Sequence, residues 1–314
     1  MRLNSKTKTI AVSALLTLGV TLSGIAEASV SSHPETSPCG IVTSAPTYKH
    51  VVVIVEAAGG YDGIVGSGYL PYFNSLVAEC GLATNDHSVT HLGLPNYLAL
   101  TSGMSMSQLA HFDNNCLPRK CTTGAPSIFG QTFAKSYEES MPKNCDRSHT
   151  SAYAPQHNPE VYYQGVSTCA SGDVPLGSLI EDFQKQGTAP SFAFVTPNVC
   201  SDMLYCPIWR GDNWLKVHLA ALLATPVYQS GNTVIILTWD DGSPPTVGEN
   251  CAKNLRDESC HVATLVIAPS VRPGTEVGTY FTHYATLRTA EQLLKLPYLG
   301  RADSGSSLVK GFNL

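Results

Sequence analysis

The sequence predicts an α/β fold in which helices cover both faces of a mostly parallel sheet. Two observations indicate it. The chain contains short, continuous apolar runs, and these runs alternate with segments of helical apolar spacing along most of the 314 residues. Such runs are typical of strands buried on both faces, and their alternation with helices is typical of a parallel sheet. The expected strands are 50–55, 191–196, 233–238 and 260–269.

Residues 1–28 have the pattern of a secretory signal peptide. Arg2, Lys6 and Lys8 precede an apolar run at 10–22, and small residues at 26 and 28 suit a cleavage site. A membrane helix is the less favoured interpretation, because the run is well short of the ~20 residues that span a bilayer. We therefore expect a secreted or extracytoplasmic protein.

The mature chain is expected to be one acidic domain. Removal of the leader takes away three basic residues and one acidic residue, so the formal charge changes from −5 to −7. That negative charge does not favour binding to nucleic acid, which is itself a polyanion. The length suits a single domain at 47–300, after a Ser/Pro-rich lead-in at 29–46 and before a tail at 301–314. We expect a monomer without a transmembrane segment.

Ten cysteines in an exported chain are expected to form disulfides, because that compartment is oxidising. Connectivity stays open on the sequence alone, but the spacings suggest local closures. The suggested pairs are Cys116–Cys121, Cys145–Cys169, Cys200–Cys206 and Cys251–Cys260, with Cys39–Cys80 tying the lead-in to the domain. A zinc cluster is less favoured, because Cys-x-x-Cys spacing is absent.

The first half of the chain places a turn and a helix start near the expected ligand edge. The strand at 50–55 ends in a turn outside the carboxyl end of the sheet, where ligands gather in such folds. Helices are expected at 70–80, 94–100 and 126–139, and a short strand at 151–153. Gly93 then lies at a helix N-terminus, which favours phosphate. The alternative is an ordinary glycine that eases a turn.

The second half adds a pair of adjacent acids. Helices are expected at 176–186, 214–223 and 283–294. Asp240 and Asp241 directly follow the strand at 233–238 and one tryptophan. Adjacent carboxylates at a strand end are costly unless a cation or hydrogen-bond donors compensate them, so both are candidate ligands of a divalent metal. A solvated turn is the alternative.

Four motifs, at 56–62, 90–97, 197–205 and 238–242, resemble those of the secreted bacterial phosphoesterases. These are the acid phosphatases and phospholipase C-like enzymes of the alkaline-phosphatase-like superfamily. The resemblance extends over about residues 48–299. It implies an alkaline-phosphatase-like fold and metal-dependent hydrolysis of a phosphate ester, either a small molecule or a lipid headgroup.

Residues on which this chemistry depends in the family are replaced in the chain. The family's metal-binding Glu-Asn pair falls on Ala57 and Ala58, its Ser or Thr nucleophile on Gly93, and a His-Asp pair on Leu204 and Tyr205. Alanine offers no lone pair to a cation, and glycine has no hydroxyl. The resemblance therefore implies that hydrolysis is lost or severely impaired and that metal binding is weak or absent.

Some polar residues of the expected pocket remain. Asp240 and Asp241 are the residual, weak metal ligands. A rearranged site is the alternative, with Glu56 as a ligand, Thr90 or Ser102 as nucleophile, or a water that attacks directly. That alternative predicts an active secreted phosphomonoesterase or phosphodiesterase. The other pocket candidates are His91, Asn96, His157 and His261.

Overall fold

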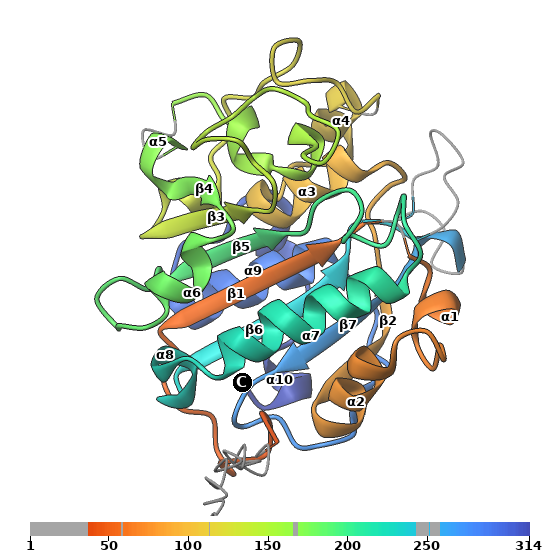
Figure 1. The fold of residues 1–314 in the computed structure, drawn as a ribbon, viewed down its shortest axis with the longest axis vertical. Coiled ribbons are helices and arrows are strands. Elements are labelled where there is room, and N and C mark those ends of the chain that lie inside the picture. Colours follow the sequence, from red (N-terminus) through yellow and green to blue (C-terminus); the bar gives the residue numbers. More distant parts are fainter. Residues whose placement is uncertain (1–36, 58, 113, 166–168, 243–250, 252–257) are drawn as a thin grey trace, which may run out of the picture. The chain divides into compact units, whose positions relative to one another are not determined.

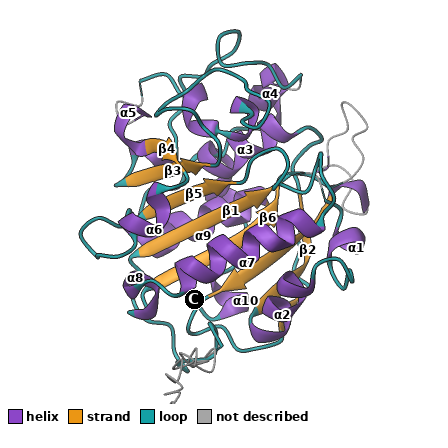
Figure 2. Cartoon of the chain, in the orientation of Figure 1, coloured by secondary structure: helices purple, strands orange, loops and turns teal. Residues whose placement is uncertain are grey.

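A computed structural model describes residues 37–57, 59–112, 114–165, 169–242, 251 and 258–314. The expected signal peptide and Ala58 lie outside these residues. Residues 37–314 form one compact unit, in which a nine-stranded sheet lies between two layers of helices (Figures 1 and 2). The strands are β1 (His50–Glu56), β2 (Gly81–His87), β3 (Ala134–Glu138), β4 (Asp173–Pro175), β5 (Phe192–Thr196), β6 (Thr233–Trp239), β7 (His261–Ile267), β8 (Thr275–Val277) and β9 (Phe281–Thr282).

The sheet is mostly parallel, as predicted. Its order is β4-β3-β5-β1-β6-β7-β2-β8, and β9 pairs with β2. The strands from β4 to β6 are mutually parallel, whereas β7 is antiparallel to both of its neighbours. All seven residues of the central strand β1 are buried. The carboxyl ends of β3, β5, β1 and β6 therefore meet at one edge of the sheet.

Helices cover both faces of this sheet. In Figure 1, α2 and α7 lie in front of the sheet, and α3 and α9 lie behind it. The α-helices are α1 (Tyr61–Ile64), α2 (Pro71–Glu79), α3 (Gly93–Ser102), α4 (Met106–Leu109), α5 (Cys169–Gly172), α6 (Ser178–Asp182), α7 (Trp209–Leu223), α8 (Pro226–Gln229), α9 (His283–Leu294) and α10 (Val309–Phe312). The 3-10 helices are η1 (Ala110–Phe112), η2 (Ile128–Gly130), η3 (Pro155–His157), η4 (Pro159–Tyr162), η6 (Glu258–Cys260) and η7 (Gly300–Ser304).

Two expected elements are wrong. The segment 126–139 contains η2 and strand β3 instead of a helix, because β3 pairs with both β4 and β5 and this pairing overrides local propensity. The segment 151–153 is not a strand. The hydroxyl of Thr150 accepts the N–H groups of Ala152 and Tyr153, which closes a turn and competes with a ladder. The helix expected at 176–186 is limited to α6.

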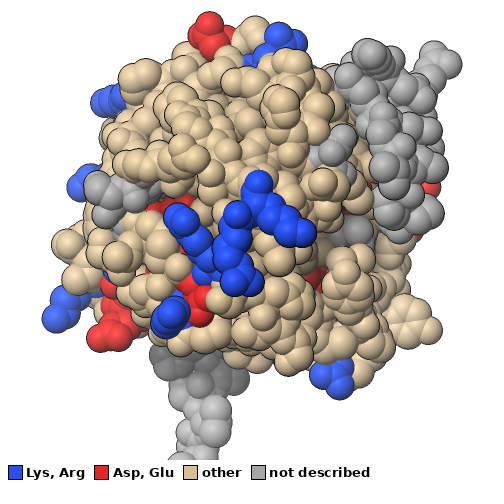
Figure 3. Space-filling model, turned by 90° about the horizontal axis from the view of Figure 1, so that it is seen from above, with Lys and Arg blue, Asp and Glu red and all other residues tan. Residues whose placement is uncertain are grey.

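The cysteines pair as the spacings suggest. The bonds are Cys39–Cys80, Cys116–Cys121, Cys145–Cys169, Cys200–Cys206 and Cys251–Cys260. None of the helices in the described part of the chain is long and apolar enough to cross a membrane. The face drawn in Figure 3 is mostly uncharged, with one group of Lys and Arg side chains near its centre.

Candidate active site

Backbone hydrogen bonds join the turns that follow β1, β5 and β6. The N–H of Ala57 donates to the carbonyl of Asp202 over 2.9 Å, and the N–H of Gly59 donates to that of Asp241, also over 2.9 Å. The N–H of Asp240 donates to the carbonyl of Glu56 over 2.8 Å. The three turns thus hold Asp240 and Asp241 beside Ala57.

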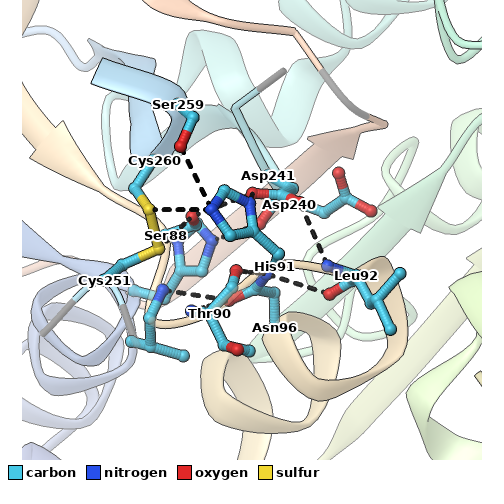
Figure 4. The surroundings of a disulfide bond; sticks show 12 residues. Ser88, Thr90, His91, Leu92, Asn96, Asp240, Asp241, Cys251, Ser259 and Cys260 are labelled. Carbon is cyan, nitrogen blue, oxygen red and sulfur yellow. Dashed lines mark hydrogen bonds and ion pairs between the residues drawn. A yellow bond between two sulfur atoms is a disulfide. The ribbon is translucent and has the colours of Figure 1, made fainter. Parts of the chain in front are cut away.

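Asp241 binds donors of the protein itself (Figure 4). Its Oδ1 accepts from the hydroxyl of Ser88 over 3.1 Å and lies 3.3 Å from His91 Nδ1, and its Oδ2 accepts from the N–H of Leu92 over 3.1 Å. Leu92 has a φ of 76°, a left-handed conformation that is costly for a branched residue. Asp241 therefore holds the strained turn that leads into α3.

Asp240 lies against the start of α3. An ideal Cβ built on Gly93 would be 2.6 Å from Asp240 Oδ2. The other carboxylate oxygen of Asp240, Oδ1, is buried and has no hydrogen-bond partner among the described residues. Burial, and then the charges of Asp241 and Asp202, raise the pKa of Asp240 well above its ordinary value. The space that a side chain at position 93 would need is occupied by this carboxylate.

The N-terminus of α3 is not an open anion cradle. The N–H of Leu94 donates to the side-chain oxygen of Asn115 over 3.0 Å, and that of Leu92 donates to Asp241. Two carboxylates lie where a phosphate would approach. The expected phosphate cradle at Gly93 is therefore occupied by acceptors of the protein, and a dianion there would be repelled unless a cation intervened.

Glu56 is a further buried carboxyl group at this edge. Both of its oxygens lack a hydrogen-bond partner within the described part of the chain. Burial, followed by the charges of Asp202, Glu139 and Asp240, raises its pKa well above the ordinary value. The next residue, Ala57, is fully buried and contributes only a methyl group. The carboxyl groups at this edge of the sheet are therefore close enough to favour the protonated form of Glu56.

Of the four remaining pocket candidates, two lie at the site. His91 contacts Asp241, and Nδ1 of His157 lies 3.3 Å from Asp202 Oδ2. Asn96 instead fixes the turn before α3, because it accepts from two backbone N–H groups and donates to the carbonyls of Thr90 and Leu92. The fourth, His261, packs against other aromatic rings.

The ring of His261 belongs to an aromatic stack between β2 and β7. It lies parallel to the ring of Tyr61, with 4.2 Å between centroids, and 5.0 Å from that of His87. Its Nε2 is 3.1 Å from the carbonyl oxygen of Thr84. The structure thus places His261 in a stack with Tyr61 and His87.

Three further expected positions bring no side chain to the acids. Leu204 and Tyr205 belong to the loop closed by Cys200–Cys206, and their side chains are 40% and 75% exposed, although the backbone N–H of Leu204 donates to Asp202 Oδ1 over 3.0 Å. Ser102 lies at the other end of α3, about 13 Å along the helix from Gly93. Its hydroxyl donates to the carbonyl of Leu98 over 2.6 Å within the helix. Ser102 is therefore wrong as a stand-in nucleophile.

The structure places three further residues at the site that the sequence analysis did not identify as members of the pocket. Ser88 and Asp202 follow the ends of β2 and β5, and Tyr97 lies one helical turn after Gly93 on the same face of α3. The hydroxyl of Tyr97 is buried without a hydrogen-bond partner among the described residues. Burial, then the charges of Asp240 and Asp202, raise its pKa. Helical spacing from Gly93 was the signal that could have identified Tyr97.

The described side chains do not gather a cluster of metal ligands around Asp240 and Asp241. Within the described residues, groups of three ligand atoms within 4.8 Å of one another occur twice, and both contain a disulfide. One group is His91 with Cys251 and Cys260, and the other is Asp173 with Cys145 and Cys169. Neither includes Asp240 or Asp241, whereas calcium and magnesium usually take six or more oxygen ligands.

Comparison with known proteins assigns the fold and the family. The chain is 29% identical over 296 residues to a phosphatidylinositol-3-phosphatase of Mycobacterium tuberculosis, covering 93% of this chain and 91% of that protein. It is 26% identical over 246 residues to an acid phosphatase of Aspergillus fumigatus, covering 75% of this chain and 53% of the fungal protein. The chain thus spans about half the length of this fungal relative.

A solved structure of a protein in the alkaline phosphatase superfamily from Vibrio parahaemolyticus matches with a TM-score of 0.57. The match covers 87% of this chain and 74% of that chain at 15% identity, so it shows a shared fold. The sequence model of the Phosphoesterase family matches residues 66–297. Because this match covers most of the chain, the protein belongs to the phosphoesterase family.

Proposed function

We propose that this protein is an exported phosphoesterase-family member that hydrolyses phosphate esters weakly or not at all. The observation that carries the proposal is that Asp240 occupies the space that a side chain at position 93 would need. The position of the family's nucleophile has no hydroxyl, and a carboxylate oxygen lies 2.6 Å from where a Cβ would stand. Neither a serine nor a phosphate fits there without movement of Asp240.

The acids at the site support the same proposal. A phosphoryl group carries negative charge, and enzymes stabilise that charge with donors or cations in a preorganised site. Here Asp240, Asp241 and Asp202 are buried, and Asp241 already binds three groups of the protein. A divalent metal would supply the missing positive charge and activate a hydroxyl or water. We infer weak or absent metal binding because, among the described residues, no third His, Cys, Asp or Glu ligand atom lies within 4.8 Å of both adjacent acids.

A second candidate function is an active secreted phosphomonoesterase or phosphodiesterase with a rearranged site. Glu56 and Tyr97 favour it, because buried polar groups without partners are rare in native proteins and such groups often bind a ligand. In that case Glu56 would join Asp240 in holding a cation, and water would replace the missing nucleophile. The substrate class would be a phosphate ester of a small molecule or a lipid headgroup.

Export and a monomeric state complete the proposal. The disulfides that join all ten cysteines support an oxidising compartment, because the cytosol keeps thiols reduced. The signal-peptide pattern at 1–28 supports the same location. We also propose that no nucleic acid binds, given the formal charge of the mature chain.

The test is turnover of chromogenic phosphate monoesters and diesters by the purified mature protein at pH 5 and pH 7. The assay is run with and without millimolar magnesium, calcium, manganese or zinc, beside an Asp240→Asn variant purified in parallel. We expect the two proteins to give the same low rate, with no response to metal. Metal-dependent turnover that Asp240→Asn abolishes would establish the rearranged site and overturn the proposal.

A further inference from the structure

His91 lies between a carboxylate and a disulfide in the buried interior near the candidate site (Figure 4). Its Nδ1 is 3.3 Å from Asp241 Oδ1, and its Nε2 is 3.5 Å from the sulfur of Cys260. One ring nitrogen of His91 and both sulfurs of Cys251–Cys260 lie within 4.8 Å of one another. In the oxidised protein these sulfurs are bonded to each other, so they are not metal ligands.

We propose that reduction of the Cys251–Cys260 disulfide creates a buried binding site for Zn²⁺, formed by the two thiolates and His91. Two thiolates and one imidazole are a known zinc ligand set, with the fourth position open to water. The charge of Zn²⁺ balances that of two thiolates, so the filled site adds no net charge to the interior. This site shares His91 and Asp241 with the candidate active site, but the proposal does not depend on the phosphoesterase function proposed above.

The distances fit tetrahedral zinc. With Zn–N of about 2.0 Å and Zn–S of about 2.3 Å, a tetrahedral angle places a nitrogen and a sulfur about 3.5 Å apart. His91 Nε2 and Cys260 Sγ are already 3.5 Å apart. Two zinc-bound sulfurs lie about 3.8 Å apart, against about 2 Å in a disulfide. After reduction, only a shift of about 2 Å between the sulfurs is needed.

Asp241 positions the imidazole for this role. Histidine ligands of zinc usually donate their other N–H to a carboxylate, which fixes the tautomer and the ring orientation. With the proton on Nδ1, facing Asp241, the lone pair of Nε2 points toward Ser259 and Cys260. Asp241 is itself held by Ser88 and by the N–H of Leu92. The hydroxyl of Ser259, 3.1 Å from Nε2, must rotate away when zinc binds.

The chemistry needs an external reductant. A dithiol gives two electrons to the Cys251–Cys260 bond, its own sulfurs form a disulfide, and both cysteines become thiols. Zn²⁺ then displaces the two thiol protons. The second group, Cys145 and Cys169 with Asp173, is less suited, because it has no imidazole and both oxygens of Asp173 accept from Asn158 Nδ2.

The experiment titrates the reduced full-length mature protein with Co²⁺, whose thiolate charge-transfer absorption reports sulfur ligands, and then displaces Co²⁺ with Zn²⁺. A phosphine reductant is used, because a dithiol would itself bind zinc. We expect one equivalent of thiolate-bound Co²⁺ in the reduced protein and none in the oxidised protein. The Cys251→Ser/Cys260→Ser variant should lose this signal, and the matched Cys116→Ser/Cys121→Ser variant should keep it. Asp241→Asn should weaken binding about 10- to 100-fold.

A Cys251→His variant removes the dependence on global reduction. It leaves Cys260 as a free thiol beside two imidazoles while the other four disulfides stay closed, and Cys251→Ala is its two-ligand control. We expect the histidine variant to bind Zn²⁺ at least tenfold more tightly than the alanine variant. Equal Co²⁺ signals from the reduced protein with and without Cys251 and Cys260 would overturn the proposal. If reduction unfolds the chain, equal zinc affinity of the Cys251→His and Cys251→Ala variants would overturn it.

Discussion

Replacing Gly93 by alanine is the most direct test of the site geometry. The added Cβ would be 2.6 Å from Asp240 Oδ2 and 3.5 Å from Tyr97 Cε2, whereas ordinary contacts begin at 3.4 Å. About 0.8 Å of movement is therefore required in a buried carboxylate. Overpacking of this kind costs about 1–3 kcal/mol, and the better helix propensity of alanine returns at most ~1 kcal/mol.

We expect Gly93→Ala to reduce the free energy of unfolding by about 1–2 kcal/mol, which lowers the Tm by about 2–8 °C in a domain of this size. Thermal and urea unfolding by circular dichroism measure the change. Gly130→Ala is the matched control, because a Cβ there meets nothing within 4 Å. Its Tm should stay within about 2 °C of the wild type.

A double-mutant cycle assigns the cost to Asp240. In an Asp240→Ala background the contacted oxygen is absent, so Gly93→Ala should become nearly neutral, and the coupling should equal the lost cost of about 1–2 kcal/mol. An unchanged Tm for Gly93→Ala, or the same loss in both backgrounds, would refute the contact on which the proposed function depends.

Three further predictions concern catalysis, metal and pH. The combination Ala57→Glu, Ala58→Asn, Gly93→Ser, Leu204→His and Tyr205→Asp should raise metal-dependent monoester hydrolysis on the order of 10³-fold above Gly93→Ser alone, because residues that act as one unit are strongly non-additive; a folded, metal-binding variant without turnover would contradict the site assignment. Millimolar calcium, magnesium or manganese should change the Tm by less than about 2 °C, since an ion of this kind needs more oxygen ligands than Asp240 and Asp241 supply; a larger rise that Asp240→Asn abolishes would reveal a missed ligand. Burial raises the pKa of Glu291 from 4.5 to about 8, so the folded state keeps a proton that the unfolded state loses, and stability falls as pH rises from about 4.5 to about 8. Relative to wild type, Glu291→Gln should gain stability across that interval, and a difference in Tm that does not change with pH would refute this.

Much of the fold could be predicted because its signals are local. The central strands are continuous apolar runs, and α2 and α9 have helical spacing within one window of sequence. Four of the five disulfides close loops of 5 to 24 residues, so spacing alone suggested them. The same locality explains the error at 126–139, where a segment of ambiguous pattern became β3 because β4 and β5 lie on either side of it.

The sequence by itself determined the side chains at the positions where the family resemblance places a metal ligand and the nucleophile. The side chain of Ala57 carries no ligand atom, and Gly93 carries no hydroxyl, in any conformation. Only the tertiary structure distinguished the role of Asp240 from that of Asp241, because the two are adjacent residues of the same type. Asp241 meets the hydroxyl of Ser88, 153 positions away in the sequence, whereas Asp240 lies against Gly93. The physical reason is that a carboxylate's role depends on the donors and charges around it, and these come from turns that adjoin only when β1, β2 and β6 lie in one sheet.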